Sequence, residues 1–129
     1  MDFTQLEAGV RVVAFVRGLD DGLFALHVYE GHIHEGGSCD RHGGHFNPAG
    51  VLHGGPESAA GQRHAGDLGN IRSERGRARY DRVDTVLRMD STDSVIGRVV
   101  AVHAGQDDLN SQPSGGSGDI AACGIIEAR

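Results

Sequence analysis

The chain has 129 residues, a formal net charge of −6 at pH 7, 21 glycines, four phenylalanines and no tryptophan. This length can bury one modest core, so a single domain spanning residues 1–129 is expected. The acidic balance argues against nucleic acid or an anionic membrane as a partner, and no stretch approaches the roughly 20 apolar residues of a membrane span. Residues 1–5 show neither the basic nor the apolar segment of a signal peptide, which favours a cytoplasmic location.

Four segments are typical of β-strands, and no apolar period of 3.6 residues persists long enough for a long helix. Each is rich in β-branched residues and is bounded by Gly, Asp or Asn: residues 11–16, 23–29, 77–83 and 94–103. Short strands joined by long loops predict an all-β Greek-key sandwich or flattened barrel. Residues 110–118 are of low complexity, and we expect them to be mobile unless they pack over a site.

The loop before the third of these segments carries three histidines and an aspartate. His45 is followed by His53, His64 and Asp67 at intervals of eight, eleven and three residues, with Gly and Pro between them. Such spacings suit a loop folded around one ion, because ligands on a helix face recur every three or four residues. Three imidazoles and one carboxylate fill a tetrahedron, so the pattern predicts structural zinc rather than hydrolytic zinc. The alternative, a histidine-rich surface loop, is disfavoured by four suitable residues in one segment.

The same loop resembles the zinc loop of the copper/zinc superoxide dismutase family. The resemblance rests on His45-Phe46-Asn47-Pro48, on His53-Gly54-Gly55-Pro56 and on residues 64–70, and it continues in residues 96–103, 107–109 and 122–126. It therefore covers nearly all of residues 9–129. It implies a metal pair, with zinc held beside copper and superoxide as the substrate.

The resemblance also implies roles for individual residues. His45 would bridge copper and zinc, and His53, His64 and Asp67 would complete the zinc shell. His103 would bind copper, and Asp107 would orient both sets of ligands from behind. Cys39 and Cys123 would form a disulfide, although composition alone favours two buried thiols in a cytosolic protein.

The copper side departs from the family pattern, in which two histidines separated by one residue lie on the same face of a strand. In one register His27 keeps the first of these positions and Tyr29 replaces the second histidine. In the other register His32 and His34 supply both imidazoles, but the strand then needs an insertion. We favour the first register because it preserves strand continuity. It predicts His27, His45 and His103 as copper ligands, with a phenol or water as a further donor.

Two further departures concern charge and the N-terminal end. The family places an arginine three residues before the last cysteine to attract superoxide, but Ile120 stands there, and the chain has no lysine. Residues 3–7 already resemble the family's second strand, so the first strand is expected to be absent. A barrel that lacks one strand exposes an edge, which favours aggregation or pairing with another chain. The C-terminal strand resembles part of the family's dimer contact, which implies a homodimer or a heterodimer with a dismutase-fold partner.

Two functions follow from the resemblance. The first is a dismutase that converts superoxide to oxygen and hydrogen peroxide, with reduced speed. The second is the non-catalytic, zinc-binding module of a copper chaperone that docks on the enzyme. The chain has no Met-x-Cys-x-x-Cys copper-delivery motif and retains His103, which favours the first function.

Overall fold

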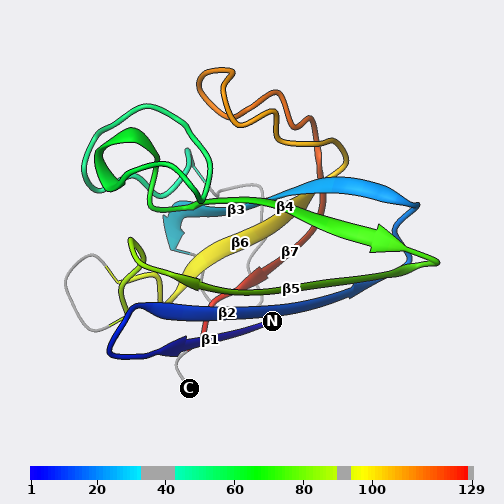
Figure 1. Cartoon of the computed structure of the whole chain (residues 1–129), viewed down its shortest axis with the longest axis horizontal. Coiled ribbons are helices and arrows are strands. Elements are labelled where there is room, and N and C mark those ends of the chain that lie inside the picture. The colour runs from blue at the N-terminus through cyan, green and yellow to red at the C-terminus, as the bar shows by residue number, and fades with distance from the viewer. Residues whose placement is uncertain (33–42, 90–93, 128–129) are drawn as a thin grey trace.

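Seven antiparallel strands form one sheet in the computed structural model, which describes residues 1–32, 43–89 and 94–127 (Figure 1). The strands are β1 Asp2–Gln5, β2 Val10–Arg17, β3 Gly22–His32, β4 Asp67–Glu74, β5 Arg77–Asp84, β6 Arg98–His103 and β7 Ile120–Ile125. A short 3₁₀ helix, η2, spans Ala60–Gln62. The expected all-β fold is confirmed, and no helix among the described residues is long and apolar enough to cross a membrane.

The strand order is β1-β2-β5-β4-β3-β6-β7, so β2 lies beside β5 and β3 lies beside β6. These non-consecutive neighbours are the crossovers of a Greek-key arrangement. The four expected strand segments correspond to β2, β3, β5 and β6, although β6 begins four residues later than expected, at Arg98. The strand β4 was missed because it begins at Asp67, directly inside the metal-loop pattern.

Strand alternation places the core on one face of the sheet. In β2, Val10, Val12 and Ala14 are fully buried, whereas Phe15 is 69% exposed. Alternate residues of a strand point to opposite faces, so this pattern directs one face of β2 to the interior. The interior-facing residues of the other strands join it in one main cluster, which includes Leu26, Leu68 and Ile71.

The sheet does not close. β1 pairs only with β2, and β7 pairs only with β6. A groove of about 250 Å³ lies between these two edges, and its lining is mostly apolar, including Phe3, Val100 and Ile125. The exposed edges agree with the expectation of an incomplete barrel.

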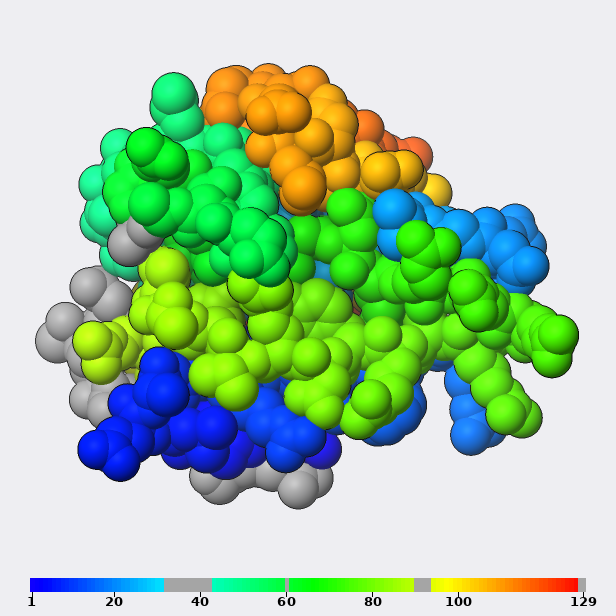
Figure 2. All heavy atoms as spheres, in the orientation of Figure 1, coloured from blue at the N-terminus to red at the C-terminus, as the bar shows by residue number. Residues whose placement is uncertain are grey.

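Two long loops cover one end of the sheet, one over residues 43–66 and the other over residues 104–119 (Figures 1 and 2). They are joined where the backbone N–H of His53 donates to the side-chain oxygen of Gln112 at 2.8 Å and the Gln112 amide donates back to the His53 carbonyl at 2.9 Å. The low-complexity segment 110–118 therefore packs against the other loop. The side chains beneath these loops form the candidate site.

Candidate metal centre

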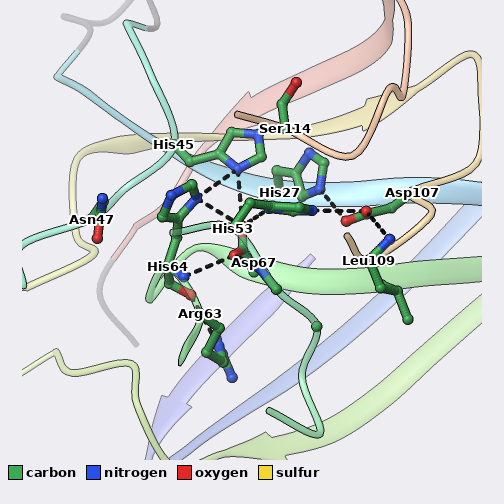
Figure 3. A network of polar contacts seen from close by, with 12 residues as sticks. His27, His45, Asn47, His53, Arg63, His64, Asp67, Asp107, Leu109 and Ser114 are labelled. Carbon is green, nitrogen blue, oxygen red and sulfur yellow. Dashed lines mark hydrogen bonds and ion pairs between the residues drawn. The ribbon is translucent and has the colours of Figure 1, made fainter. Parts of the chain in front are cut away.

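The first donor group comes from the loop over residues 43–66 and the start of β4. We call His45, His53, His64 and Asp67 the carboxylate cluster. The Asp67 Oδ1 atom lies 2.9 Å from His45 Nδ1, 2.8 Å from His53 Nδ1 and 3.2 Å from His64 Nδ1 (Figure 3). All four residues are buried. Three ring nitrogens that converge on one carboxylate oxygen form a compact set of donors for one cation.

The Asp67 carboxylate is oriented by its own loop. Its second oxygen, Oδ2, accepts hydrogen bonds from the backbone N–H groups of Gly54 at 2.9 Å and His64 at 2.8 Å. The loop is held to the sheet through Gly66, whose N–H donates to the Phe46 carbonyl and whose carbonyl accepts from Val28 in β3. A side chain at Gly66 would collide with the Val28 carbonyl, so this close approach requires glycine. Local packing therefore positions the Asp67 carboxylate and the loop that carries the three histidines.

Asp107 connects this cluster to β3. Its two carboxylate oxygens lie 2.8 Å from His53 Nε2 and 2.7 Å from His27 Nε2. Asn70 fixes the backbone of Asp107 by accepting from its N–H at 2.8 Å and donating to its carbonyl at 3.0 Å. Asp107 thus contacts one ring of each donor group, and its role in orienting metal ligands stays a prediction. The contribution of Asn70 was missed, although this residue ends the motif of residues 64–70.

The second donor group is built from two strands. We call His27 and Tyr29 of β3 together with His103 of β6 the strand cluster. The ring centroids of His27 and His103 lie 5.0 Å apart, and that of His45 lies 4.0 Å from His27. The Tyr29 hydroxyl lies 2.5 Å from His103 Nε2. The side chains of the first register thus meet at one place, whereas His32 ends β3 beside Arg98 and His34 lies outside the described residues.

Two ring nitrogens in this region are buried without a hydrogen-bond partner. They are His27 Nδ1 and His45 Nε2, and Arg82 Nε is the third such side-chain atom in the described part of the chain. Since His27 Nε2 bonds to Asp107 and His45 Nδ1 bonds to Asp67, the unpartnered nitrogens present lone pairs. A buried lone pair without a donor is costly, and a metal ion would satisfy both. His27, His45, His53 and Asp67 each offer a donor atom within 4.8 Å of the others.

The two groups differ in their protonation. Burial lowers the pKa of His27 to about 4, against the opposing hydrogen bond with Asp107. Burial also acts to lower the pKa of His53, but hydrogen bonds with Asp107 and Asp67 outweigh it and raise this pKa to about 9. Burial works to raise the pKa of Asp67, but hydrogen bonds from His45 and His53 hold it well below its usual range. In the metal-free protein at neutral pH, His53 is therefore an imidazolium and His27 is neutral.

A cleft of about 760 Å³ opens over the strand cluster, with Tyr29, His45 and His103 in its wall. Ile120 lines it as well, together with the acidic residues Glu30 and Asp119. None of the described lining residues is an arginine. The cleft therefore leads to the ring nitrogens past two acidic residues and past no described arginine.

The loop over residues 104–119 approaches Asp107, His53 and His103 closely. Gly115 has a φ of +78°, and a side chain there would collide with the Asp107 carboxylate and come within 2.8 Å of His53 Nε2. The Gly118 carbonyl accepts from His103 Nδ1 at 2.9 Å. Gly115 therefore allows the backbone of this low-complexity segment to lie against Asp107 and His53, which composition alone did not reveal.

A buried ion pair supports the loop from below. Arg63 Nη1 lies 2.8 Å from Asp84 Oδ2, and the same guanidinium donates to the carbonyls of His64 and Ala65. The Arg63 side chain is 1% exposed and that of Asp84 is fully buried. The sequence did not predict this ion pair, because Arg63 and Asp84 lie 21 residues apart and no motif joins them.

Cys123 lies on β7, and Cys39 falls outside the described residues. The disulfide between them therefore stays a prediction. The buried group of His27, His45, His53 and Asp67 is consistent with a zinc site, although it contains His27 where the predicted zinc set has His64.

Comparisons with known proteins agree with this geometry. The family model described as copper/zinc superoxide dismutase matches residues 1–126. An extracellular superoxide dismutase [Cu-Zn] of Haemonchus contortus is 37% identical over 134 residues, covering 98% of this chain and 71% of that protein. A crystal structure of the clock protein EA4 superposes with a TM-score of 0.85 at 37% identity, covering 95% of this chain and 82% of that one. The chain belongs to the copper/zinc superoxide dismutase family.

Proposed function

We propose that this protein is a superoxide oxidoreductase of the dismutase type that uses a copper–zinc pair. His45, His53, His64 and Asp67 hold zinc, and His27, His45 and His103 hold copper. The observation that carries the proposal is the pair of buried, unpartnered nitrogens, His27 Nδ1 and His45 Nε2, beside a complete carboxylate cluster. If the protein bound structural zinc alone, the lone pairs of His27 Nδ1 and His45 Nε2 would remain without a metal or a hydrogen-bond donor.

Copper held by His27, His45 and His103 would supply the redox chemistry, in which one superoxide is oxidised to oxygen and a second superoxide, with two protons, is reduced to hydrogen peroxide. The side chains provide position and proton transfer. His45 belongs to both donor sets, so its Nε2 is the ring atom best placed to carry a proton toward the cleft. Asp107 holds the rings of His27 and His53 in a fixed orientation.

The same geometry implies slow turnover. Glu30 and Asp119 line the cleft, and Ile120 occupies the position of the family's arginine. Electrostatic steering changes association rates by about 10 to 1,000-fold, so an acidic cleft slows the capture of superoxide without removing the chemistry.

A second candidate is a zinc-binding module of a copper chaperone that docks on a dismutase without turning over superoxide. The observation in its favour is Tyr29, because the phenol bonds to His103 Nε2 and stands where the family has a copper-binding histidine. The expected homodimer or heterodimer and the cytoplasmic location also stay predictions.

The test is the copper and zinc content of the purified protein, with superoxide consumption measured on the same sample. We expect one zinc and one copper per chain, turnover that His103→Ala abolishes, and zinc retained in that variant. His27→Ala and His32→Ala form a matched pair, because only the first should lose copper if the first register is correct. Zinc alone with no turnover would replace the dismutase by the docking module.

A further inference from the structure

Tyr29 is the residue of the strand cluster that the proposed set of ligands does not use. It follows His27 by two residues on β3, so both side chains leave the strand on the same face. Its ring centroid lies 5.1 Å from that of His45 and 5.8 Å from that of His103. The residue is 5% exposed and forms part of the cleft wall. The phenol therefore lies among the three imidazoles.

The contact between Tyr29 and His103 has a defined direction. His103 Nδ1 lies 2.9 Å from the Gly118 carbonyl, which can only accept a hydrogen bond, so Nδ1 carries the proton in the neutral ring. Nε2 is then left with a lone pair, and the Tyr29 hydroxyl donates to it across 2.5 Å. A metal bound to His103 through Nε2 needs this same lone pair. His103 Nε2 therefore cannot bind a metal and accept the hydrogen bond from Tyr29 at the same time.

The packing around Tyr29 limits how far its phenol can move when a metal occupies His103 Nε2. Its ring packs with Val99 and Ala101 of β6 and with Ile120 of β7, so the side chain is anchored along its length. Its oxygen is held on the side of His103 that presents Nε2. The unpartnered lone pairs of His27 Nδ1 and His45 Nε2 belong to rings whose centroids lie 6.4 Å and 5.1 Å from that of Tyr29. The phenolic oxygen is thus an oxygen donor beside His103 Nε2 and within the same group of rings.

We propose that the phenolic oxygen of Tyr29 is the fourth protein ligand of copper(II), beside His27 Nδ1, His45 Nε2 and His103 Nε2. This inference rests on the proposed function, since it requires copper at this position. An oxygen–copper bond forms, the O–H bond breaks, and the proton passes to water in the cleft; no electron is transferred in this step. An anionic oxygen donor favours copper(II) over copper(I), because copper(I) prefers softer ligands. Tyr29 therefore tunes the site toward the oxidised metal.

The experiment adds copper(II) to the zinc-loaded protein and records visible absorption and electron paramagnetic resonance spectra. A phenolate bound to copper(II) gives a charge-transfer band in the visible region that imidazole ligands do not give. We expect this band in the wild type, its loss in Tyr29→Phe, and at least a tenfold weaker copper(II) affinity in that variant. Tyr29→His should bind copper with a spectrum typical of nitrogen ligands only.

Tyr80→Phe is the matched control. Tyr80 is also buried, but its hydroxyl donates to the Leu68 carbonyl at 2.8 Å and takes no part in the strand cluster. This variant should keep the band. Zinc content and the thermal midpoint report whether Tyr29→Phe has folded, and Tyr29→His supplies a second variant at the same position.

The outcomes separate the two proposals. A wild type that binds copper with a spectrum unchanged by Tyr29→Phe overturns the ligand role of Tyr29 and leaves the proposed function standing. Tighter copper binding by Tyr29→Phe also overturns it, because the hydroxyl would then only compete for His103. A zinc-loaded wild type that binds no copper overturns both.

Discussion

The carboxylate cluster and the strand cluster are neighbours that share His45, but they are assembled differently. The donors of the carboxylate cluster come from residues 45–67 and meet on one oxygen of Asp67. The strand cluster combines β3 with the end of β6, more than 70 residues apart, and includes a phenol. The carboxylate cluster combines histidines and an aspartate from one segment, whereas the proposed copper set depends on two distant strands and has a tyrosine beside its histidines.

Their protonation differs in the same way. His53 carries a proton on the nitrogen that zinc would use, because two carboxylates stabilise the imidazolium. His27 presents a bare nitrogen at neutral pH, because burial disfavours its charged form. At the proposed sites, zinc would therefore displace a proton from His53, whereas copper would meet an available lone pair on His27 Nδ1.

The largest effect should come from removing Arg63, whose buried ion pair with Asp84 supports the loop of the carboxylate cluster. Arg63→Ala leaves the Asp84 carboxylate buried without its partner and removes two donors from the loop carbonyls. We expect the free energy of unfolding to fall by about 3 to 5 kcal/mol, together with weaker zinc binding. Denaturant unfolding and zinc titration measure both.

Arg11→Ala is the control, since Arg11 pairs with Asp81 at the surface with its side chain 49% exposed. That variant should lose much less stability than Arg63→Ala, because solvent screens an exposed ion pair. Equal losses in the two variants would show that the buried pair does not brace the loop.

The next effect concerns pH in the metal-free protein. The pKa of His53 is raised from 6.5 to about 9 on folding, so its contribution to stability is complete below pH 6.5 and is lost as pH rises through 9. This shift corresponds to about 3 kcal/mol. We therefore expect the free energy of unfolding to fall by that order between these pH values, as measured by urea unfolding of the metal-free chain.

His53→Gln should flatten the profile in the same window, because glutamine does not titrate. Zinc binding to the wild type should strengthen as pH rises, since less proton competes for His53 Nδ1. A flat wild-type profile would mean that the two carboxylates do not hold His53 charged.

The smallest effect concerns the cleft over the strand cluster. Ile120→Arg adds a positive charge to a wall that carries Glu30 and Asp119. We expect superoxide consumption at low ionic strength to rise about tenfold and the gain to shrink with added salt. Phe15→Arg changes the net charge equally on an exposed part of β2 and should leave the rate unchanged. Equal rates for both variants and the wild type would show that charge in the cleft does not limit capture.

Much of this protein could be predicted from the sequence where the information is local. The loop spacing of His45, His53, His64 and Asp67 predicted a compact donor set, because a short Gly-rich loop can fold its own residues around one point. Segments rich in β-branched residues and bounded by Gly, Asp or Asn predicted β2 and β3, and strand continuity favoured the register that places His27 and Tyr29 together. The start of β4 was obscured because Asp67 serves both the loop and the strand.

The rest depended on contacts between distant segments. The bond between Tyr29 and His103 exists because β3 and β6 are neighbours in the sheet, although β4 and β5 separate them in the chain. The Arg63–Asp84 brace and the fit of Gly115 against Asp107 likewise follow from how loops settle on the sheet. The sequence by itself determined the family, the all-β class and the residue types that bind metal, because these depend on short-range pattern. Only the tertiary structure decided which nitrogens are left without a partner, since burial and hydrogen bonding are set by the strand order and by the loops that close over it.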